Sequence, residues 1–310
     1  MALVTSKGML QRALTGDYTV GAFNITSMES IQALIRAAAD EKSPVIIQCF
    51  GAYRDHFGPS YLKNVIRTAI EETGAEVCLH LDHGPDFQTC KSCVDGGFTS
   101  VMFDGSALPF EENIAITKDV VSYAHAHGVV VEAELGKLVG VEGAINVDPA
   151  AASFTDPAQA QEFVERTGVD SLAVSVGTSH GAYKYKGDSY LDFDRLDAIH
   201  KALPDTPLVL HGASCVLPAA VEECIRYGGQ IAGAKGVSEA MIEESAKHGV
   251  CKINTDTDVK LAMTTAIRRF FTENPEVIDP WQYLALSREA IYEMARRKMR
   301  DVLHSSGKAI

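Results

Sequence analysis

Three histidines that are each followed by glycine are the first candidates for chemistry in this sequence. They are His83, His180 and His211. Three neutral imidazoles are a common protein ligand set for a catalytic zinc ion that keeps one coordination position open. A glycine beside each one lets the backbone come close to a bound ligand. Any single buried histidine is more often only hydrogen-bonded, but the repeated context favours a metal site for the set.

Four acidic residues form a second group of candidates. Asp82 precedes His83 and could move protons beside a metal without binding it. Glu132 and Glu134 are two residues apart on an expected strand and therefore face one side, where Asp104 could meet them. Carboxylates that point into a protein need a cation or a shared proton. They form a candidate second metal position, and a salt-bridged layer is the alternative.

Short runs of small residues and hydrogen-bond donors form another group of candidates. Residues 181–184 read GAYK, residues 211–214 read HGAS and residues 254–257 read NTDT. Backbone N–H groups, hydroxyl groups and a lysine are suited to binding an anion, so these segments predict a phosphate site. Neither a P-loop nor a dinucleotide fingerprint is present, which argues against a nucleotide cofactor.

Apolar segments that alternate with helical segments must position these residues. The apolar segments are short and do not alternate cleanly with polar residues, which is typical of strands buried on both faces of a parallel sheet. Eight such strands with helices between them predict an α/β protein folded as a (β/α)8 TIM barrel, with its active site at the carboxyl ends of the strands. The predicted strands are 19–24, 44–49, 76–82, 99–104, 129–134, 170–176, 208–211 and 250–254.

Three segments extend beyond a minimal barrel. Residues 136–153 form a long loop after strand 5, on the face where active sites lie, and this predicts a lid. Residues 230–249 predict an insertion with an extra helix before strand 8. Residues 280–303 predict extra C-terminal helix, whose basic residues at 296–300 are expected to form a solvated face. No linker interrupts the sequence, so we expect one domain over residues 1–310.

Composition excludes several classes of protein. The chain has 310 residues, of which 46% are hydrophobic and 22% are charged, and its formal net charge is −13. Such an acidic chain is not expected to bind nucleic acid. No apolar run approaches the roughly 20 residues of a membrane span, and the N-terminus shows no signal sequence. The odd, scattered set of seven cysteines fits a reduced cytoplasm, and Cys90 and Cys93 are expected to share one helix face.

The motifs together resemble those of class II, zinc-dependent fructose-bisphosphate aldolases and their tagatose-bisphosphate relatives, most closely the class IIB subgroup. The resemblance covers nearly the whole chain and implies a homodimer or homotetramer. The motifs that carry it are GAFN at 21–24, HLDHG at 80–84, SVMFDGS at 100–106, EAELG at 132–136, GTSHGAYK at 177–184, LHGAS at 210–214 and CKINTDTD at 251–258.

The resemblance also implies roles for individual residues. Asp82 matches the acid and base at the C4 hydroxyl of the substrate, and Glu142 matches the group that transfers a proton at the dihydroxyacetone phosphate carbon. Lys260 stands where this subgroup usually has an arginine for the far phosphate, supplied across a subunit interface. The catalytic zinc ligands are matched by His83, His180 and His211, and a second position for a divalent or monovalent cation by Asp104 and Glu134 with Glu132 nearby. The other substrate contacts are matched by Asn24, Gly181, Lys184, Gly212, Ser214, Asn254, Asp256 and Thr257.

The function implied is reversible cleavage of a ketose bisphosphate to dihydroxyacetone phosphate and an aldehyde, through an enediolate that zinc stabilises. Fructose 1,6-bisphosphate, which would give glyceraldehyde 3-phosphate, is the leading substrate. One alternative is an aldolase for tagatose 1,6-bisphosphate or for a ketose 1-phosphate with another tail. The other is a phosphosugar-binding protein without catalysis.

Overall fold

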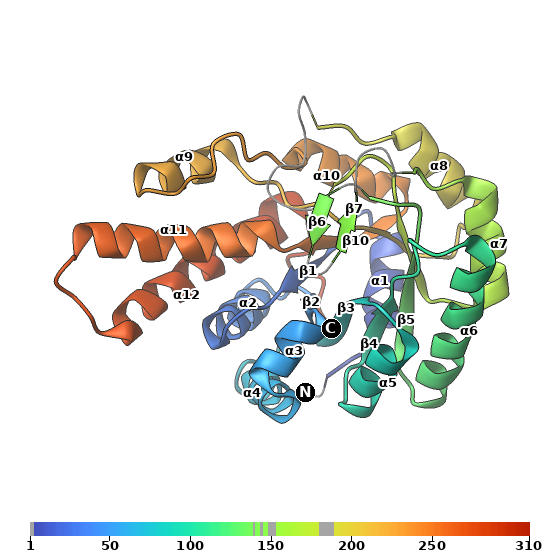
Figure 1. Cartoon of the computed structure of the whole chain (residues 1–310), viewed down its shortest axis with the longest axis horizontal. Coiled ribbons are helices and arrows are strands. Elements are labelled where there is room, and N and C mark those ends of the chain that lie inside the picture. The colour runs from blue at the N-terminus through green and yellow to red at the C-terminus, as the bar shows by residue number, and fades with distance from the viewer. Residues whose placement is uncertain (1–2, 139, 143–144, 148–152, 180–188) are drawn as a thin grey trace.

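Eight parallel strands close into a barrel in the computed structural model, which describes residues 3–138, 140–142, 145–147, 153–179 and 189–310 (Figure 1). The strands follow one another around the barrel in the order β1-β10-β9-β8-β5-β4-β3-β2. The predicted (β/α)8 barrel is therefore confirmed. The strands are β1 Val20–Asn24, β2 Val45–Cys49, β3 Val77–Gly84, β4 Ser100–Phe103, β5 Val130–Leu135, β8 Ser171–Val174, β9 Leu208–Leu210 and β10 Val250–Thr255.

Every residue of these eight strands is buried, which explains why their sequences lack a polar side. Helices cover the outer face, and helix α1 closes the amino end of the barrel by packing Met9 and Leu10 against Val20 and Cys78. This leaves the opposite, carboxyl end of the barrel for the candidate site residues. The helices are α1 Ser6–Leu14, α2 Met28–Asp40, α3 Gly51–Phe57, α4 Pro59–Thr73, α5 Phe87–Asp95, α6 Phe110–Ala126, α7 Pro157–Thr167, α8 Phe193–Ala202, α9 Pro218–Arg226, α10 Glu239–Ser245, α11 Thr257–Glu273 and α12 Pro280–Arg297.

The long segment after β5 contains a small hairpin. Strands β6 (Gly140–Glu142) and β7 (Ile145–Val147) pair antiparallel, with Glu142 opposite Ile145. Lys137 and Ser153 exchange backbone hydrogen bonds of 2.9 and 3.1 Å. The segment therefore leaves the barrel and returns at one place. The predicted insertion before the last barrel strand is also present and contains α10.

Helices α11 and α12, together with α9, project to one side of the barrel as an arm (Figure 1). The prediction of extra C-terminal helix is confirmed, and Arg300 is exposed as expected, but the expected solvated face is wrong for Lys298. Lys298 is only 2% exposed, and Arg296 and Arg297 form ion pairs with Glu41 and Glu239. The ion-pair partners, Glu41 and Glu239, lie far from residues 296–297 in the sequence, so these arginines link the end of α12 to other elements.

None of the helices in the described part of the chain is long and apolar enough to cross a membrane. All seven cysteines lie in that part, and each is buried and free. Cys90 and Cys93 both lie on α5, as expected for two cysteines on one buried helix face.

Candidate active site

A distortion of β3 brings two neighbouring residues to the carboxyl end of the barrel. Successive strand residues normally point to opposite faces, but the pairing of β3 with β4 shifts register between Leu81 and Gly84, and His83 has a φ of 47°. Such bulges redirect side chains and are frequent beside active sites. Asp82 and His83 consequently lie in the same cluster of potential metal ligands, together with His211.

The imidazoles of His83 and His211 face each other edge to face. Their ring planes meet at 87°, and His83 Nε2 lies 2.8 Å from His211 Nδ1. The second nitrogen of each ring reaches a carboxylate: His83 Nδ1 is 2.7 Å from Asp104 Oδ2, and His211 Nε2 is 2.7 Å from Glu132 Oε1. Each ring is thus held by a carboxylate on the side away from its partner.

This arrangement fits a metal site. A histidine that ligates a metal usually donates its other ring N–H to a carboxylate, and both rings do so here. The two nitrogens that remain, 2.8 Å apart, would both present lone pairs, and these repel each other unless a cation or a proton lies between them. Imidazole nitrogens suit Zn²⁺ and similar divalent ions.

The pKa values of the buried groups reflect the same crowding. Burial opposes a charged His83, but the charges of Asp82, Asp104 and Glu134 outweigh it and raise the pKa of His83 to about 9. Burial, and then the charge of His83, lowers the pKa of His211 well below its usual value. Burial and the charge of Asp104 raise the pKa of Glu134. Without a metal, the cluster therefore favours one protonated imidazole.

Asp82 is held by amide groups from two other barrel strands, β1 and β10. Its Oδ2 accepts a hydrogen bond of 2.7 Å from Asn24, and its Oδ1 accepts one of 3.0 Å from Asn254. Gln48 in turn donates to the Asn24 carbonyl at 2.8 Å. Asp82 Oδ1 lies 4.0 Å from His83 Nε2. The carboxylate is therefore fixed beside the histidine pair rather than bonded to it.

The candidate residues of the second cation position separate into two places. Asp104 and Glu134 gather around His83, with Glu134 Oε2 3.9 Å from His83 Nδ1. That oxygen is buried and has no hydrogen-bond partner among the described residues. Glu132 lies on the other side, where Lys252 Nζ is 2.9 Å from its Oε2. The structure thus joins Glu132 to His211 and Lys252 and not to the group around His83.

Lys252 is a site residue that sequence reasoning missed. It lies inside the barrel on β10 and is fully buried, and its Nζ is also 3.4 Å from His80 Nε2. The other ring nitrogen of His80, Nδ1, forms a hydrogen bond of 2.8 Å with Ser100 Oγ. A lysine in the middle of the apolar segment 250–254 is the signal that could have identified this buried group.

The expected phosphate residues surround the turn after β9. Gly212 has a φ of 60°, and a Cβ there would lie 2.4 Å from the Ser179 carbonyl oxygen. Ser214 Oγ accepts hydrogen bonds of 3.1 Å from the backbone N–H groups of Asp256 and Thr257. The structure therefore brings Gly212, Ser214 and the start of α11 together, as the motifs predict.

Lys260 lies on the first turns of α11 and contacts its own chain. Its Nζ is 2.5 Å from Asp256 Oδ2 and 5.8 Å from the centre of the Tyr53 ring. The side chain remains 41% exposed. Three other candidates, His180, Gly181 and Lys184, lie outside the described residues. Glu142 is described only as part of the backbone of β6.

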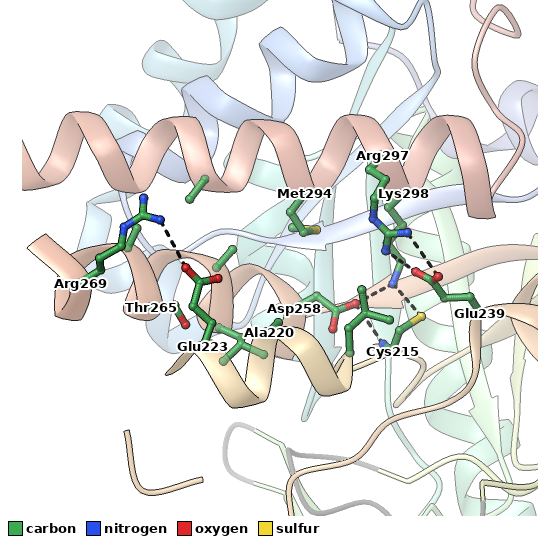
Figure 2. A pocket seen from close by; sticks show the side chains of 15 residues that line it. Cys215, Ala220, Glu223, Glu239, Asp258, Thr265, Arg269, Met294, Arg297 and Lys298 are labelled. Atoms are coloured by element: carbon green, nitrogen blue, oxygen red, sulfur yellow. Dashed lines mark hydrogen bonds and ion pairs between the residues drawn. The ribbon is translucent and has the colours of Figure 1, made fainter. Parts of the chain in front are cut away.

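A separate cavity of about 260 Å³ lies in the arm, between α9, α11 and α12 (Figure 2). Apolar side chains such as Leu261 and Met294 form much of its wall. Ion pairs at its two ends join Arg269 to Glu223 and Arg297 to Glu239. None of the metal-ligand candidates in the described part of the chain lines this cavity, so the cavity is distinct from the cluster at the barrel end.

Comparison with known proteins agrees with this fold and identifies the family of the chain. The family model described as "Fructose-bisphosphate aldolase class-II" matches residues 4–230 and 231–308. A fructose-bisphosphate aldolase of Giardia intestinalis is 46% identical and covers 97% of this chain and 93% of its own length. One of Thermus caldophilus is 44% identical, with 99% and 100% covered. The crystal structure of the YdjI aldolase from Escherichia coli K12 has a TM-score of 0.81 at 31% identity, with 100% of both chains covered.

Proposed function

This chain belongs to the class II fructose-bisphosphate aldolase family, and from that premise we propose that it cleaves fructose 1,6-bisphosphate reversibly to dihydroxyacetone phosphate and glyceraldehyde 3-phosphate. It is an aldolase, a carbon–carbon lyase, of a family that depends on a metal. The observation that carries the proposal is the buried cluster of Asp82, His83 and His211, in which a carboxylate stands beside two convergent imidazoles.

We propose Zn²⁺ as the metal. His83 Nε2 and His211 Nδ1 would hold it, and His180 is the third ligand expected from the sequence. When bound, the ion acts as a Lewis acid that polarises the substrate carbonyl. Asp104 and Glu132 orient the two imidazoles through the nitrogens that face away from the metal position.

Asp82 is the proposed acid and base. In the cleavage direction its carboxylate takes the proton of the C4 hydroxyl, and in the condensation direction it returns that proton. Asn24 and Asn254 fix the carboxylate through both of its oxygens, so these two residues position Asp82 in addition to their expected contacts with substrate. Glu142, on the β6–β7 hairpin, is the proposed group that transfers a proton at the dihydroxyacetone phosphate carbon.

Asp104 and Glu134 are proposed to hold a second cation beside His83. Support comes from the buried Glu134 Oε2, which lacks a hydrogen-bond partner among the described residues. Glu132 contributes there only indirectly, because it is engaged with His211 and Lys252. The ion could be divalent or monovalent, since carboxylate oxygens bind both.

The substrate phosphates are proposed to bind at two places. The near phosphate is bound by Gly181, Lys184, Gly212 and Ser214 with donors from Asn254, Asp256 and Thr257. The far phosphate is read by Lys260. The ion pair between Lys260 and Asp256 keeps that ammonium close to the site within one chain, and the far phosphate would compete with Asp256 for it.

We also propose a homodimer or homotetramer formed through the arm. Five large hydrophobic side chains of the arm are exposed, and the most exposed are Ile278 at 88% and Trp281 at 66%. Exposed apolar patches of this kind mark interaction surfaces. Sedimentation at micromolar concentration checks the assembly, and Ile278→Glu with Trp281→Glu should shift it to monomers. The free cysteines support a reducing cytoplasm as the compartment.

A substrate panel tests the proposed function. Enzyme that has been stripped of metal and then reloaded with Zn²⁺ is given fructose 1,6-bisphosphate, tagatose 1,6-bisphosphate and fructose 1-phosphate, and release of dihydroxyacetone phosphate is measured. We expect release only after reloading and most rapidly from fructose 1,6-bisphosphate. Faster cleavage of another sugar phosphate would identify that sugar as the substrate. If none of the three released dihydroxyacetone phosphate, the chain would be a phosphosugar-binding protein without catalysis.

A further inference from the structure

The turn after β9 carries backbone strain next to the proposed near-phosphate site. Val216 has a φ of 47°, a left-handed value at which a β-branched residue is an outlier. Strained residues of this kind persist only where surrounding contacts fix them. Residues 212–216 must therefore be held in place by other parts of the molecule.

Asp258, in the first turn of α11, makes the contacts that hold this turn. Its Oδ2 accepts the backbone N–H of Cys215 at 3.0 Å, and its Oδ1 accepts that of Val216 at 2.8 Å. The Asp258 side chain is 11% exposed. Because two consecutive N–H groups bind the two oxygens of one carboxylate, the position of Asp258 determines the path of the turn.

Lys298 completes the arrangement from the end of the C-terminal helix. Its Nζ lies 2.7 Å from Asp258 Oδ2 and 3.5 Å from Cys215 Sγ, and its side chain is 3% exposed. Figure 2 shows this lysine directed at Asp258 and Cys215, whereas its neighbour Arg297 turns to Glu239. Burial opposes both charges, but their attraction prevails, lowering the pKa of Asp258 and raising that of Lys298.

The same turn carries a proposed phosphate contact. Ser214 Oγ accepts the first N–H groups of the α11 region, from Asp256 and Thr257, and the Ser214 carbonyl accepts Val237 N–H at 3.1 Å. A shift of Cys215 and Val216 would move Ser214 directly, because the three residues are consecutive. Asp258 and Lys298 thus contact Cys215, the residue after Ser214, but do not line the proposed phosphate site themselves.

We propose that Asp258 and Lys298 are positioning residues that hold residues 212–216 and so set the affinity for the near phosphate of the substrate. Loss of the Lys298 charge leaves Asp258 as an uncompensated buried carboxylate, which destabilises its contacts with the turn. The inference depends on the proposed function for the identity of the phosphate site. It adds a role for the C-terminal helix, which contributes no side chain to the metal cluster.

Lys298→Met in the zinc-loaded full chain tests the proposal. We expect the Kd for dihydroxyacetone phosphate, measured by calorimetry, and the KM for fructose 1,6-bisphosphate to rise roughly 10- to 100-fold, as for a binding group displaced by about 1 Å. The zinc content should stay unchanged, and kcat should change less than about threefold. Arg297→Met is the matched control: it removes a neighbouring ion pair at the same cavity and should leave Kd and KM unchanged.

A double variant keeps the test valid if Lys298→Met does not fold. Asp258→Asn combined with Lys298→Met leaves no unpaired buried charge but removes one acceptor of the turn, so the same weakening is expected. A lowered Tm with Kd and KM within about twofold of wild type would overturn the proposal, as would an equal effect of Arg297→Met.

The same measurements separate this inference from the proposed function. If the wild-type enzyme binds dihydroxyacetone phosphate but cleaves no bisphosphate, the proposed function fails. The comparison of Kd between the wild type and Lys298→Met still tests the role of Asp258 and Lys298. If cleavage is normal and Lys298→Met leaves Kd unchanged, the pair has no positioning role and the proposed function stands. Wild-type protein that binds neither dihydroxyacetone phosphate nor inorganic phosphate would overturn both.

Discussion

At the scale of single residues, proton and metal compete for the histidine pair. In the metal-free protein His83 has a pKa of about 9, so it carries a proton at pH 7 that a metal must displace. We expect zinc binding at pH 7 to release about one proton, and the apparent affinity to rise with pH up to about 9. Calorimetry in buffers of different ionisation enthalpy measures this. Zinc uptake at pH 7 without proton release would contradict the assignment of His83 as a ligand.

The same pKa predicts how the stability of the metal-free protein changes with pH. The folded pKa of His83 is raised above the ordinary value of 6.5, so its contribution to the free energy of unfolding is fully present below about 6.5 and lost as the pH rises through about 9. Thermal melts of the chelated protein should show this loss, and those of chelated His83→Gln should not. Equal pH dependence of the two proteins would assign the loss to other groups.

Asp82→Asn tests the proton transfer. The amide keeps the size of the side chain but cannot accept the C4 hydroxyl proton as a base, so kcat should fall about 10²- to 10⁴-fold. The zinc content should be retained, because Asp82 lies beside the histidine pair and is bonded to Asn24 and Asn254. Asp86→Asn is the control, since Asp86 only caps α5 and asparagine caps equally well. Wild-type kcat in Asp82→Asn would exclude it as the base.

At the scale of elements, the buried ion pair of Glu132 on β5 with Lys252 on β10 is expected to stabilise the barrel. Lys252→Met would leave Glu132 as a buried carboxylate without its cation, and we expect the free energy of unfolding to fall by about 3–5 kcal/mol. Lys7→Met is the control: Lys7 pairs with Asp170 but its side chain is 64% exposed, so its loss should cost at most about 1 kcal/mol. Denaturant unfolding measures both.

Loss of Lys252 should also lower the affinity for zinc. Glu132 orients His211 through a 2.7 Å hydrogen bond, and changes to such supporting groups typically weaken metal affinity about 10- to 100-fold. A chelator competition assay on Lys252→Met measures the shift. Unchanged zinc affinity would show that Glu132 holds His211 without help from the lysine.

At the scale of the whole molecule, substrate choice depends on how Lys260 meets the far end of the sugar. Lysine gives one movable charge where arginine would give two directed hydrogen bonds. We expect Lys260→Ala to lower kcat/KM for fructose 1,6-bisphosphate by about 10- to 150-fold, as for the loss of a charge-assisted contact. Fructose 1-phosphate, which lacks the far phosphate, should be affected far less. Equal losses for both would remove Lys260 from the far-phosphate site.

Assembly adds a second question about this lysine. The structure of one chain places Lys260 beside its own Asp256, whereas the prediction from the sequence is that Lys260 binds the substrate of a neighbouring subunit. Mixed oligomers of Asp82→Asn and Lys260→Ala chains distinguish the two. Recovery of activity toward the bisphosphate in the mixture would show that the lysine acts across the interface.

At the scale of the whole chain, the pattern of residue types predicts the architecture and most of the candidate site. Strands buried on both faces are mostly apolar, so eight short, mainly apolar segments that alternate with helices predict the barrel. The candidate site residues are recognisable because they lie at strand ends in motifs of unusual composition, with a glycine after each candidate histidine. Asp82, His83 and His211 were all predicted in this way, and the structure brings them into one cluster.

How these residues meet depends on packing between segments that are distant in the chain. Strand periodicity puts Asp82 and His83 on opposite faces, and the bulge in β3 that reunites them has no clear signature in the sequence. Lys252 and Lys298 are distant in the chain from Glu132 and Asp258, so their buried pairs follow from packing that local patterns do not encode. A run of basic residues predicts a solvated surface because charges prefer water, and that expectation fails where a folded neighbour supplies a carboxylate instead.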